Sequence, residues 1–177
     1  MGKYKVIDGN EACAHISYMF TEIAGIYPIT PASPMSEYID KWSTEGRLNL
    51  FNNRVKLIEM QSEAGAIALV HGSLQTGSLA STYTASQGLL LMIPSMYKIA
   101  GEMLPCVINV ASRTVATHAL SIFGDHSDIY ASRGTGFCFL ASSSVEDTIY
   151  MTLASYLSTL NCLLYTSPSP RDKRQSR

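Results

Sequence analysis

The sequence predicts an α/β protein with a mostly parallel sheet and helices on both faces of that sheet. Short apolar segments alternate along the chain with longer segments whose apolar residues follow helical spacing. Strands that are separated by helices of this length form βαβ units, and such units build parallel sheets. Several apolar segments are also continuous rather than alternating, which is typical of strands buried on both faces.

Five short segments have the composition of strands. They are rich in apolar and β-branched residues and are bounded by glycine, proline or polar residues. The expected strands cover residues 25–27, 55–59, 79–83, 106–110 and 137–141. We expect 106–110 to be a central strand because the whole segment is apolar or β-branched apart from Asn109.

Helices are expected between these strands, at residues 10–23, 33–45, 62–72, 87–93, 96–102 and 144–160. Asp8 or Asn10 could cap the first helix, and Ser33 followed by Pro34 resembles an N-cap with proline at the first helical position. Pro94 is expected to separate two helices, because proline removes a backbone donor. Ser144, with Asp147 three residues later, resembles a capping box.

Composition and charge exclude several classes of function. The chain has 177 residues and a net charge of −1, and basic residues cluster only in the last seven positions, so we expect no nucleic-acid partner. No apolar run is long enough to span a bilayer, and no signal-peptide segment follows the first lysines. The four cysteines are far apart and form no Cys-x-x-Cys pair, which favours a cytoplasmic protein with buried thiols.

The composition changes near the carboxyl end. Residues 1–161 have the composition of one packed domain, whereas residues 162–177 contain closely spaced prolines and a basic polar end. The string from 162 to 177 resembles translated sequencing-adapter read-through joined to an incomplete gene. The alternative is a genuine disordered tail. We therefore expect a domain at 1–161 and a non-native tail at 162–177.

Three polar residues stand where the chain leaves an expected strand or enters a helix. Thr30 lies in a proline-rich loop, a junction where open parallel sheets bind ligands; it could equally be part of a rigid turn. Arg113 follows the 106–110 strand and could grip a small carboxylate with two N–H groups, or form a structural salt bridge. Glu63 begins a helix of small apolar residues; it could serve chemistry or lie on a solvated face. A metal site in the polar run 118–128 is not expected, because its spacing matches no zinc pattern.

Taken in series, five motifs resemble the amino-terminal domain of the pyruvate:ferredoxin oxidoreductase family. They are DGNEA at 8–12, YPITP at 27–31, EMQSEAGA at 59–66, TASQGL at 84–89 and HALSIFGDH at 118–126. The resemblance covers residues 4–161, and the long stretch at 121–126 resembles the single-chain, homodimeric type. Gly134 stands where glutamine is more usual, Cys106 where glycine is common, and Asn52-Asn53 replaces a glycine-containing turn.

The resemblance implies an oxidoreductase that converts pyruvate and coenzyme A to acetyl-CoA and carbon dioxide. Electrons would pass through [4Fe-4S] clusters to ferredoxin or flavodoxin. Thiamine diphosphate would carry the chemistry, with its aminopyrimidine facing this domain and its diphosphate and Mg²⁺ held by a domain missing from this chain. The missing segments also lead us to expect that the fragment alone is inactive.

The resemblance also gives roles to four residues. Glu63 matches the glutamate that shares a proton with the aminopyrimidine ring, which activates the thiazolium carbon. Arg113 matches the arginine that binds the substrate carboxylate, and Thr30 matches the threonine that donates a hydrogen bond to substrate. Pro28 is expected to shape the cofactor wall. The alternatives are a related 2-oxoacid:ferredoxin oxidoreductase subunit, a non-catalytic partner-binding domain of the same fold, and a transketolase-like enzyme.

Overall fold

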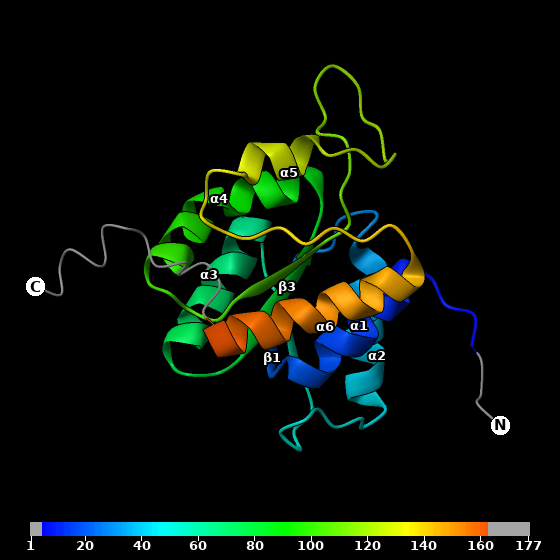
Figure 1. Ribbon diagram of the computed structural model, residues 1–177, viewed down its shortest axis with the longest axis vertical. Helices are drawn as coiled ribbons and strands as arrows, with labels where there is room; N and C mark the ends of the chain where they lie inside the picture. Colours follow the sequence, from blue (N-terminus) through cyan, green and yellow to red (C-terminus); the bar gives the residue numbers. More distant parts are fainter. Residues whose placement is uncertain (1–4, 163–177) are drawn as a thin grey trace, which may run out of the picture.

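The computed structural model describes residues 5–162 and contains one parallel sheet. Its strands are β1 (Ile23–Ile26), β2 (Lys56–Glu59), β3 (Ala80–Thr84) and β4 (Val107–Val110), in the spatial order β2-β1-β3-β4. The register pairs Ile26 with Glu59 and Thr84 with Val110, so the carboxyl ends of neighbouring strands lie at the same edge. The predicted parallel α/β fold is confirmed (Figure 1).

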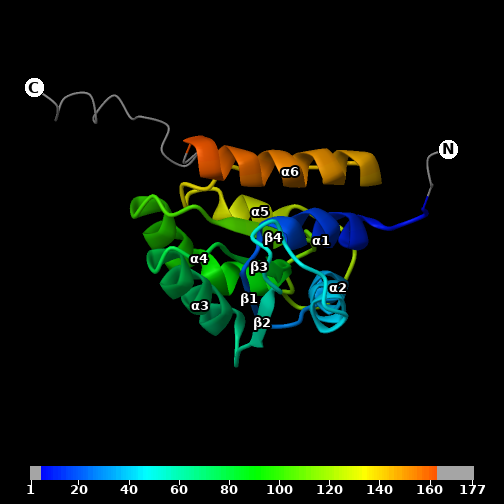
Figure 2. The same cartoon turned by 90° about the horizontal axis from the view of Figure 1, so that it is seen from below.

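Helices cover both faces of the sheet, as the sequence predicts (Figure 2). On one face α3 (Glu63–Gln75) and α4 (Ser86–Gly101) pack together, and the short helix α5 (Ser127–Ser132) packs on α4. On the other face lie α1 (Gly9–Phe20) and α2 (Ser33–Thr44). The last helix, α6 (Val145–Cys162), packs along α1 and contacts β4.

Two apolar cores follow from this layering, because neighbouring side chains of a strand point to opposite faces. Ala24 and Ile26 of β1 pack with α1 and α2, whereas Ile23 packs with α3 and α4. Gly25 lies directly under α3: a Cβ there would stand 2.8 Å from the carbonyl oxygen of Ala66. The absence of a side chain at Gly25 therefore allows α3 to lie close to the sheet.

The helix caps agree with the sequence at most positions. Asp8, Ser62 and Ser144 each accept a hydrogen bond from a backbone N–H in the first turn of their helix, at 2.7, 3.2 and 3.0 Å. Ser33 is not an N-cap as predicted; it lies inside α2, and the cap position is Ala32. The first helix also ends earlier than predicted, because Thr21 adopts extended backbone and β1 begins at Ile23.

The predicted helix break at Pro94 is wrong, because α4 continues through it. A proline inside a helix removes one hydrogen bond to the preceding turn. Pro94 lies on the exposed side of α4, while Met92 and Met96 on either side of it are buried in the core. Burial of these flanking residues holds the helix together across the missing bond.

The predicted strand at 137–141 is also wrong, and 106–110 is not central. Residues 137–142 form no strand, and β4 is the last strand at one edge of the sheet that the structure describes. Residues of this segment and of β4 both line a cavity of about 710 Å³. Aromatic and apolar composition favours extended backbone, but a strand also requires regular pairing with a neighbouring strand, and no such pairing is assigned to this segment.

The expected domain boundary falls at the end of α6, whose last residue is Cys162. The rest of the expected tail, residues 163–177, lies outside the described residues. None of the helices within 5–162 combines the length and hydropathy needed to cross a bilayer.

Candidate functional site

The candidate site lies at the edge of the sheet where all four strands end. Thr30 follows β1, Glu63 follows β2, Gln87 follows β3 and Arg113 follows β4. This edge is the usual location of ligands in open α/β sheets. Residues that are far apart in the sequence therefore meet because of the parallel topology.

Arg113 is buried, with 5% of its surface exposed, and its guanidinium connects two of the other segments. Nη1 donates to the backbone carbonyl of Thr30 at 2.7 Å, and Nη2 donates to the side-chain oxygen of Gln87 at 2.9 Å. Nε is buried and has no hydrogen-bond partner among residues 5–162. The structure therefore brings Thr30 and Arg113 together, through the Thr30 carbonyl rather than its hydroxyl.

Gln87 fixes the side of the guanidinium that faces α4. Its side-chain nitrogen donates to the carbonyl of Ala116 at 3.2 Å, which leaves its oxygen to accept from Arg113. The hydroxyl of Ser86 lies 2.5 Å from the same oxygen and 2.7 Å from the carbonyl of Thr114. The sequence assigns no specific role to Gln87, so its contact with Arg113 is a finding of the structure.

Asp128 is the residue of this site that the sequence did not reveal. It is fully buried at the start of α5, and its carboxylate accepts from the backbone amide of Arg113 at 3.0 Å and from that of Ser86 at 2.9 Å. In the sequence Asp128 ends the polar run 118–128, in which no metal site is expected. The sequence of that run does not show that Asp128 is buried whereas Asp125 is exposed.

Glu63 is the first residue of α3 and is buried, with 6% of its surface exposed. Its carboxylate accepts no hydrogen bond from any residue in the described part of the chain, 5–162. A Cβ placed on Gly88 would stand 2.9 Å from Oε1 of Glu63 and 2.4 Å from Oγ1 of Thr84, so α4 approaches both oxygens closely. The Thr84 hydroxyl is buried and also lacks a partner among the described residues.

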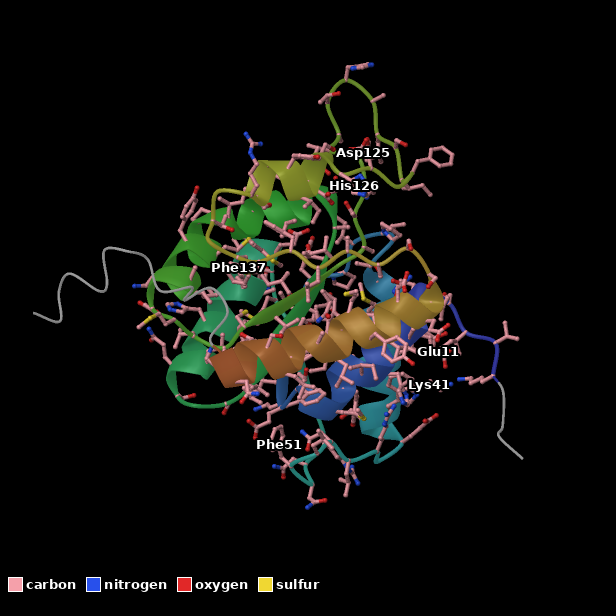
Figure 3. All side chains as sticks on the ribbon, in the orientation of Figure 1. Glu11, Lys41, Phe51, Asp125, His126 and Phe137 are labelled. Carbon is pink, nitrogen blue, oxygen red and sulfur yellow. The ribbon has the colours of Figure 1, made fainter. Side chains whose placement is uncertain are left out.

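The remaining predicted site residue, Pro28, is exposed in the loop after β1, as is Thr30. The role of Pro28 in shaping a cofactor wall stays a prediction. Figure 3 shows Asp125 and His126 at the base of the projecting loop that leads into α5. A hydrogen bond from the Ser127 hydroxyl is the main reason that the pKa of Asp125 is below its usual range. Within residues 5–162 no group of three or more His, Cys, Asp or Glu residues could hold a metal ion.

The 710 Å³ cavity borders this site without containing its central groups. Pro31, Ser112 and His126 line it, but Glu63, Thr30 and Arg113 do not. The polar network is therefore distinct from the more apolar space between β4 and residues 137–142.

Comparison with known proteins places this chain in a family. The family model described as "Pyruvate flavodoxin/ferredoxin oxidoreductase, thiamine diP-bdg" matches residues 16–168, which is most of the chain. The chain belongs to this family. The match includes Thr30, Glu63, Gln87, Arg113 and Asp128.

Individual relatives agree with the family match. The chain is 58% identical over 156 residues to a pyruvate:ferredoxin oxidoreductase of Moorella thermoacetica, a match that covers 88% of this chain and 13% of that protein. It is 55% identical over 159 residues to a pyruvate-flavodoxin oxidoreductase of Enterobacter agglomerans, covering 90% of this chain and 14% of the relative. The chain thus spans only a small part of these relatives' length.

A solved structure shares the fold. It is a 2-oxoglutarate:ferredoxin oxidoreductase from Magnetococcus marinus with 2-oxoglutarate, coenzyme A and succinyl-CoA bound. The TM-score is 0.70 at 23% sequence identity, over 86% of this chain and 27% of that one. At this identity the likeness concerns the fold alone.

Proposed function

We propose that this chain is the part of a pyruvate:ferredoxin or pyruvate:flavodoxin oxidoreductase that faces the aminopyrimidine of thiamine diphosphate. The whole enzyme would convert pyruvate and coenzyme A to acetyl-CoA and carbon dioxide and pass the electrons to ferredoxin or flavodoxin. Family membership supports the reaction class. The observation that carries the proposal is the buried Glu63 carboxylate, which has no donor in the described chain and lies against Gly88.

The residues around Glu63 fit such a cofactor. Burying a hydroxyl without a partner is unfavourable, as at Thr84, and the largely buried Glu63 carboxylate also accepts no hydrogen bond from the described residues, so both side chains have hydrogen-bonding capacity that a ligand could satisfy. An aminopyrimidine has a ring nitrogen and an exocyclic amine and can therefore meet both kinds of group. Thiamine diphosphate, when bound, supplies the carbon nucleophile and the electron sink that decarboxylation of a 2-oxo acid requires.

Glu63 would hold the ring nitrogen and share a proton with it. Its position at the first turn of α3, with Ser62 as the cap, fixes the carboxylate on a rigid element rather than on a loop. Low exposure keeps water away from the shared proton, which strengthens the hydrogen bond. Gly88 supports this arrangement by leaving room for the Glu63 side chain under α4.

Arg113 would bind the substrate carboxylate. Arginine carries five N–H donors, and those of Arg113 that are not used by Thr30 and Gln87 include the buried Nε–H. A carboxylate would satisfy that donor and gain a charge-assisted hydrogen bond. Thr30, exposed beside Arg113, would donate its hydroxyl to the substrate.

Other parts of the reaction would come from outside this chain, which spans 13% and 14% of the two relatives. We propose that Mg²⁺, the diphosphate site, the [4Fe-4S] clusters and the coenzyme A site belong to the remainder of a homodimeric, cytoplasmic enzyme. The 177 residues alone would then be inactive. We also propose that the domain ends at residue 161 and that 162–177 is not part of it.

The test is a substitution in the whole enzyme that carries these positions. Arg113→Lys keeps the charge, but lysine cannot contact Thr30, Gln87 and a carboxylate in the same planar arrangement. We expect the KM for pyruvate to rise by about tenfold or more, with a smaller change in kcat, as measured by coenzyme A-dependent ferredoxin reduction. An unaltered enzyme that oxidises 2-oxoglutarate but not pyruvate would contradict the proposed substrate, and an unchanged KM would contradict the role of Arg113.

A further inference from the structure

Asp128 is a buried carboxylate with an unusually complete set of donors. It has no exposed surface, and none of the described residues forms an ion pair with it. Oδ2 accepts from the backbone amides of Ser86 at 2.9 Å and Arg113 at 3.0 Å. Oδ1 accepts from the hydroxyl of Ser112 at 2.6 Å and from the amide of Ile129 at 2.7 Å. These bonds replace the hydration that a buried carboxylate loses.

The donors come from three segments of the chain. Ser86 begins α4, Ser112 and Arg113 follow β4, and Ile129 belongs to α5. Asp128 therefore joins the two loops that leave the central and edge strands β3 and β4 at the site. A carboxylate that only anchored its own helix would need the Ile129 amide and no donor from α4 or from Arg113.

The bond to Ser86 has a particular consequence. Ser86 has a φ of +48°, a left-handed conformation that is unfavourable for residues other than glycine. Hydrogen bonding of its amide to Asp128 stabilises this conformation. The side-chain oxygen of the next residue, Gln87, accepts a hydrogen bond from the guanidinium of Arg113. The backbone amide of Arg113 donates to the same Asp128 oxygen as the amide of Ser86. One oxygen thus fixes the backbone on both sides of the Gln87–Arg113 contact.

We propose that Asp128 is a positioning residue for the guanidinium of Arg113 and thereby sets the affinity of the site for the substrate carboxylate. This inference rests on the proposed function, in which Arg113 binds a 2-oxo acid. Asp128 touches neither substrate nor cofactor in this account. It acts by keeping Arg113 and Gln87 in the arrangement that leaves Nε–H of Arg113 available.

Two variants of the whole enzyme test the proposal. Asp128→Asn keeps the size of the side chain but replaces charge-assisted bonds with weaker neutral ones and turns an acceptor into a donor. Asp128→Ala removes all four bonds; if it does not fold, Asp128→Asn still decides the question. The control is Ser132→Ala, which removes a buried hydrogen bond of 3.0 Å to the Asp128 carbonyl in the same helix without altering the carboxylate.

The readouts are the dissociation constant of oxamate, an unreactive analogue of pyruvate, the KM and kcat for pyruvate, and hydrogen exchange of the Ser86 and Arg113 amides. For Asp128→Asn we expect weaker oxamate binding and a higher KM, each by about tenfold, a smaller change in kcat, and faster exchange at both amides. Ser132→Ala should leave the oxamate affinity unchanged.

The outcomes separate the two claims. If the unaltered enzyme does not bind oxamate, the proposed carboxylate site fails, and this inference fails with it. If the unaltered enzyme binds oxamate and Asp128→Asn binds it equally well, only the positioning role is overturned, even if amide exchange is faster. If Ser132→Ala weakens oxamate binding as much as Asp128→Asn does, the effect comes from α5 as a whole and the carboxylate has no special role.

Discussion

At the scale of single residues, the close approach of α4 to Glu63 defines the candidate cofactor site. Gly88 is needed there because a side chain would meet Thr84 and Glu63 at distances that real Cβ atoms do not adopt. At Gly72, inside α3, an added Cβ would have no heavy atom within 4 Å, so the packing there does not require glycine. The two glycines therefore allow the same substitution to be compared in a tight and in an open position.

We predict opposite effects for alanine at these two glycines. Gly88→Ala should destabilise the chain by about 1–3 kcal/mol, because Thr84 or Glu63 must move. Gly72→Ala should stabilise it by roughly 0.5–1 kcal/mol through helix propensity. Urea unfolding of both variants checks the prediction. Equal stabilisation by both substitutions would show that Glu63 does not lie against Gly88.

The sequence allowed part of the site to be predicted. Thr30, Glu63 and Arg113 stand at junctions between strands and helices, and this position together with the family resemblance was enough to select them. The sequence could not show that Arg113 contacts the Thr30 carbonyl or that Asp128 is buried, because both depend on how loops pack after three different strands. Asp125 and Asp128 have the same side chain, and only the fold distinguishes the exposed one from the buried one.

At the scale of secondary structure, local sequence patterns predicted which helices and strands are present better than where they end or which strands pair. Capping residues such as Asp8 and Ser144 gave correct helix starts, because a cap depends on a few neighbouring residues. The predicted helix break at Pro94 was wrong because burial of Met92 and Met96, on either side of it, outweighs the loss of one hydrogen bond. The predicted strand at 137–141 was wrong because strand formation depends on pairing with a neighbouring strand as well as on composition.

The contact between α3 and α4 leads to a pH prediction. Hydrogen bonds from Lys98 and His71 lower the pKa of Glu102, at the end of α4, from 4.5 to about 2. A carboxylate with a lower pKa in the folded state stabilises that state above its unfolded pKa and loses this contribution as the pH falls. We therefore expect Glu102→Gln to reduce the loss of stability between pH 4.5 and pH 2.

Urea unfolding of the chain across this pH range measures the effect. Glu146→Gln serves as the control, because Glu146 is exposed and forms no ion pair with the described residues. If Glu102→Gln and the unaltered chain lose the same stability between these pH values, the ionised Glu102 carboxylate gains no stability from Lys98 of α4 or from His71 of α3.

At the scale of the whole molecule, apolar side chains remain exposed at two segments. The loop that projects in Figure 1 carries Leu120, Ile122 and Phe123, which are 72%, 57% and 81% exposed. Phe139 and Leu140 are also exposed, beside the edge strand β4. Exposed apolar groups next to a sheet edge favour association between proteins.

We predict that the 177-residue chain on its own associates as its concentration rises. Replacing Ile122 and Phe123 with serine should shift sedimentation profiles toward the monomer, because two consecutive exposed apolar side chains are removed from the loop. Val6→Ser is the control, since Val6 is 99% exposed but lies far from this loop along the chain. A chain that sediments as a monomer at all concentrations would contradict the prediction.

The central claim is that Glu63 shares a proton with the cofactor, and one measurement tests it directly. In the whole enzyme loaded with thiamine diphosphate, the rate at which the thiazolium C2 proton exchanges with deuterium is compared for the unaltered protein, Glu63→Gln and Glu59→Gln. Glu59, exposed at the end of β2, controls for loss of a nearby charge. We predict that Glu63→Gln slows exchange by roughly 10²–10⁴-fold while Glu59→Gln leaves it unchanged. Near-normal exchange in Glu63→Gln, with the cofactor still bound, would contradict the assignment of this domain to the activating side of thiamine diphosphate.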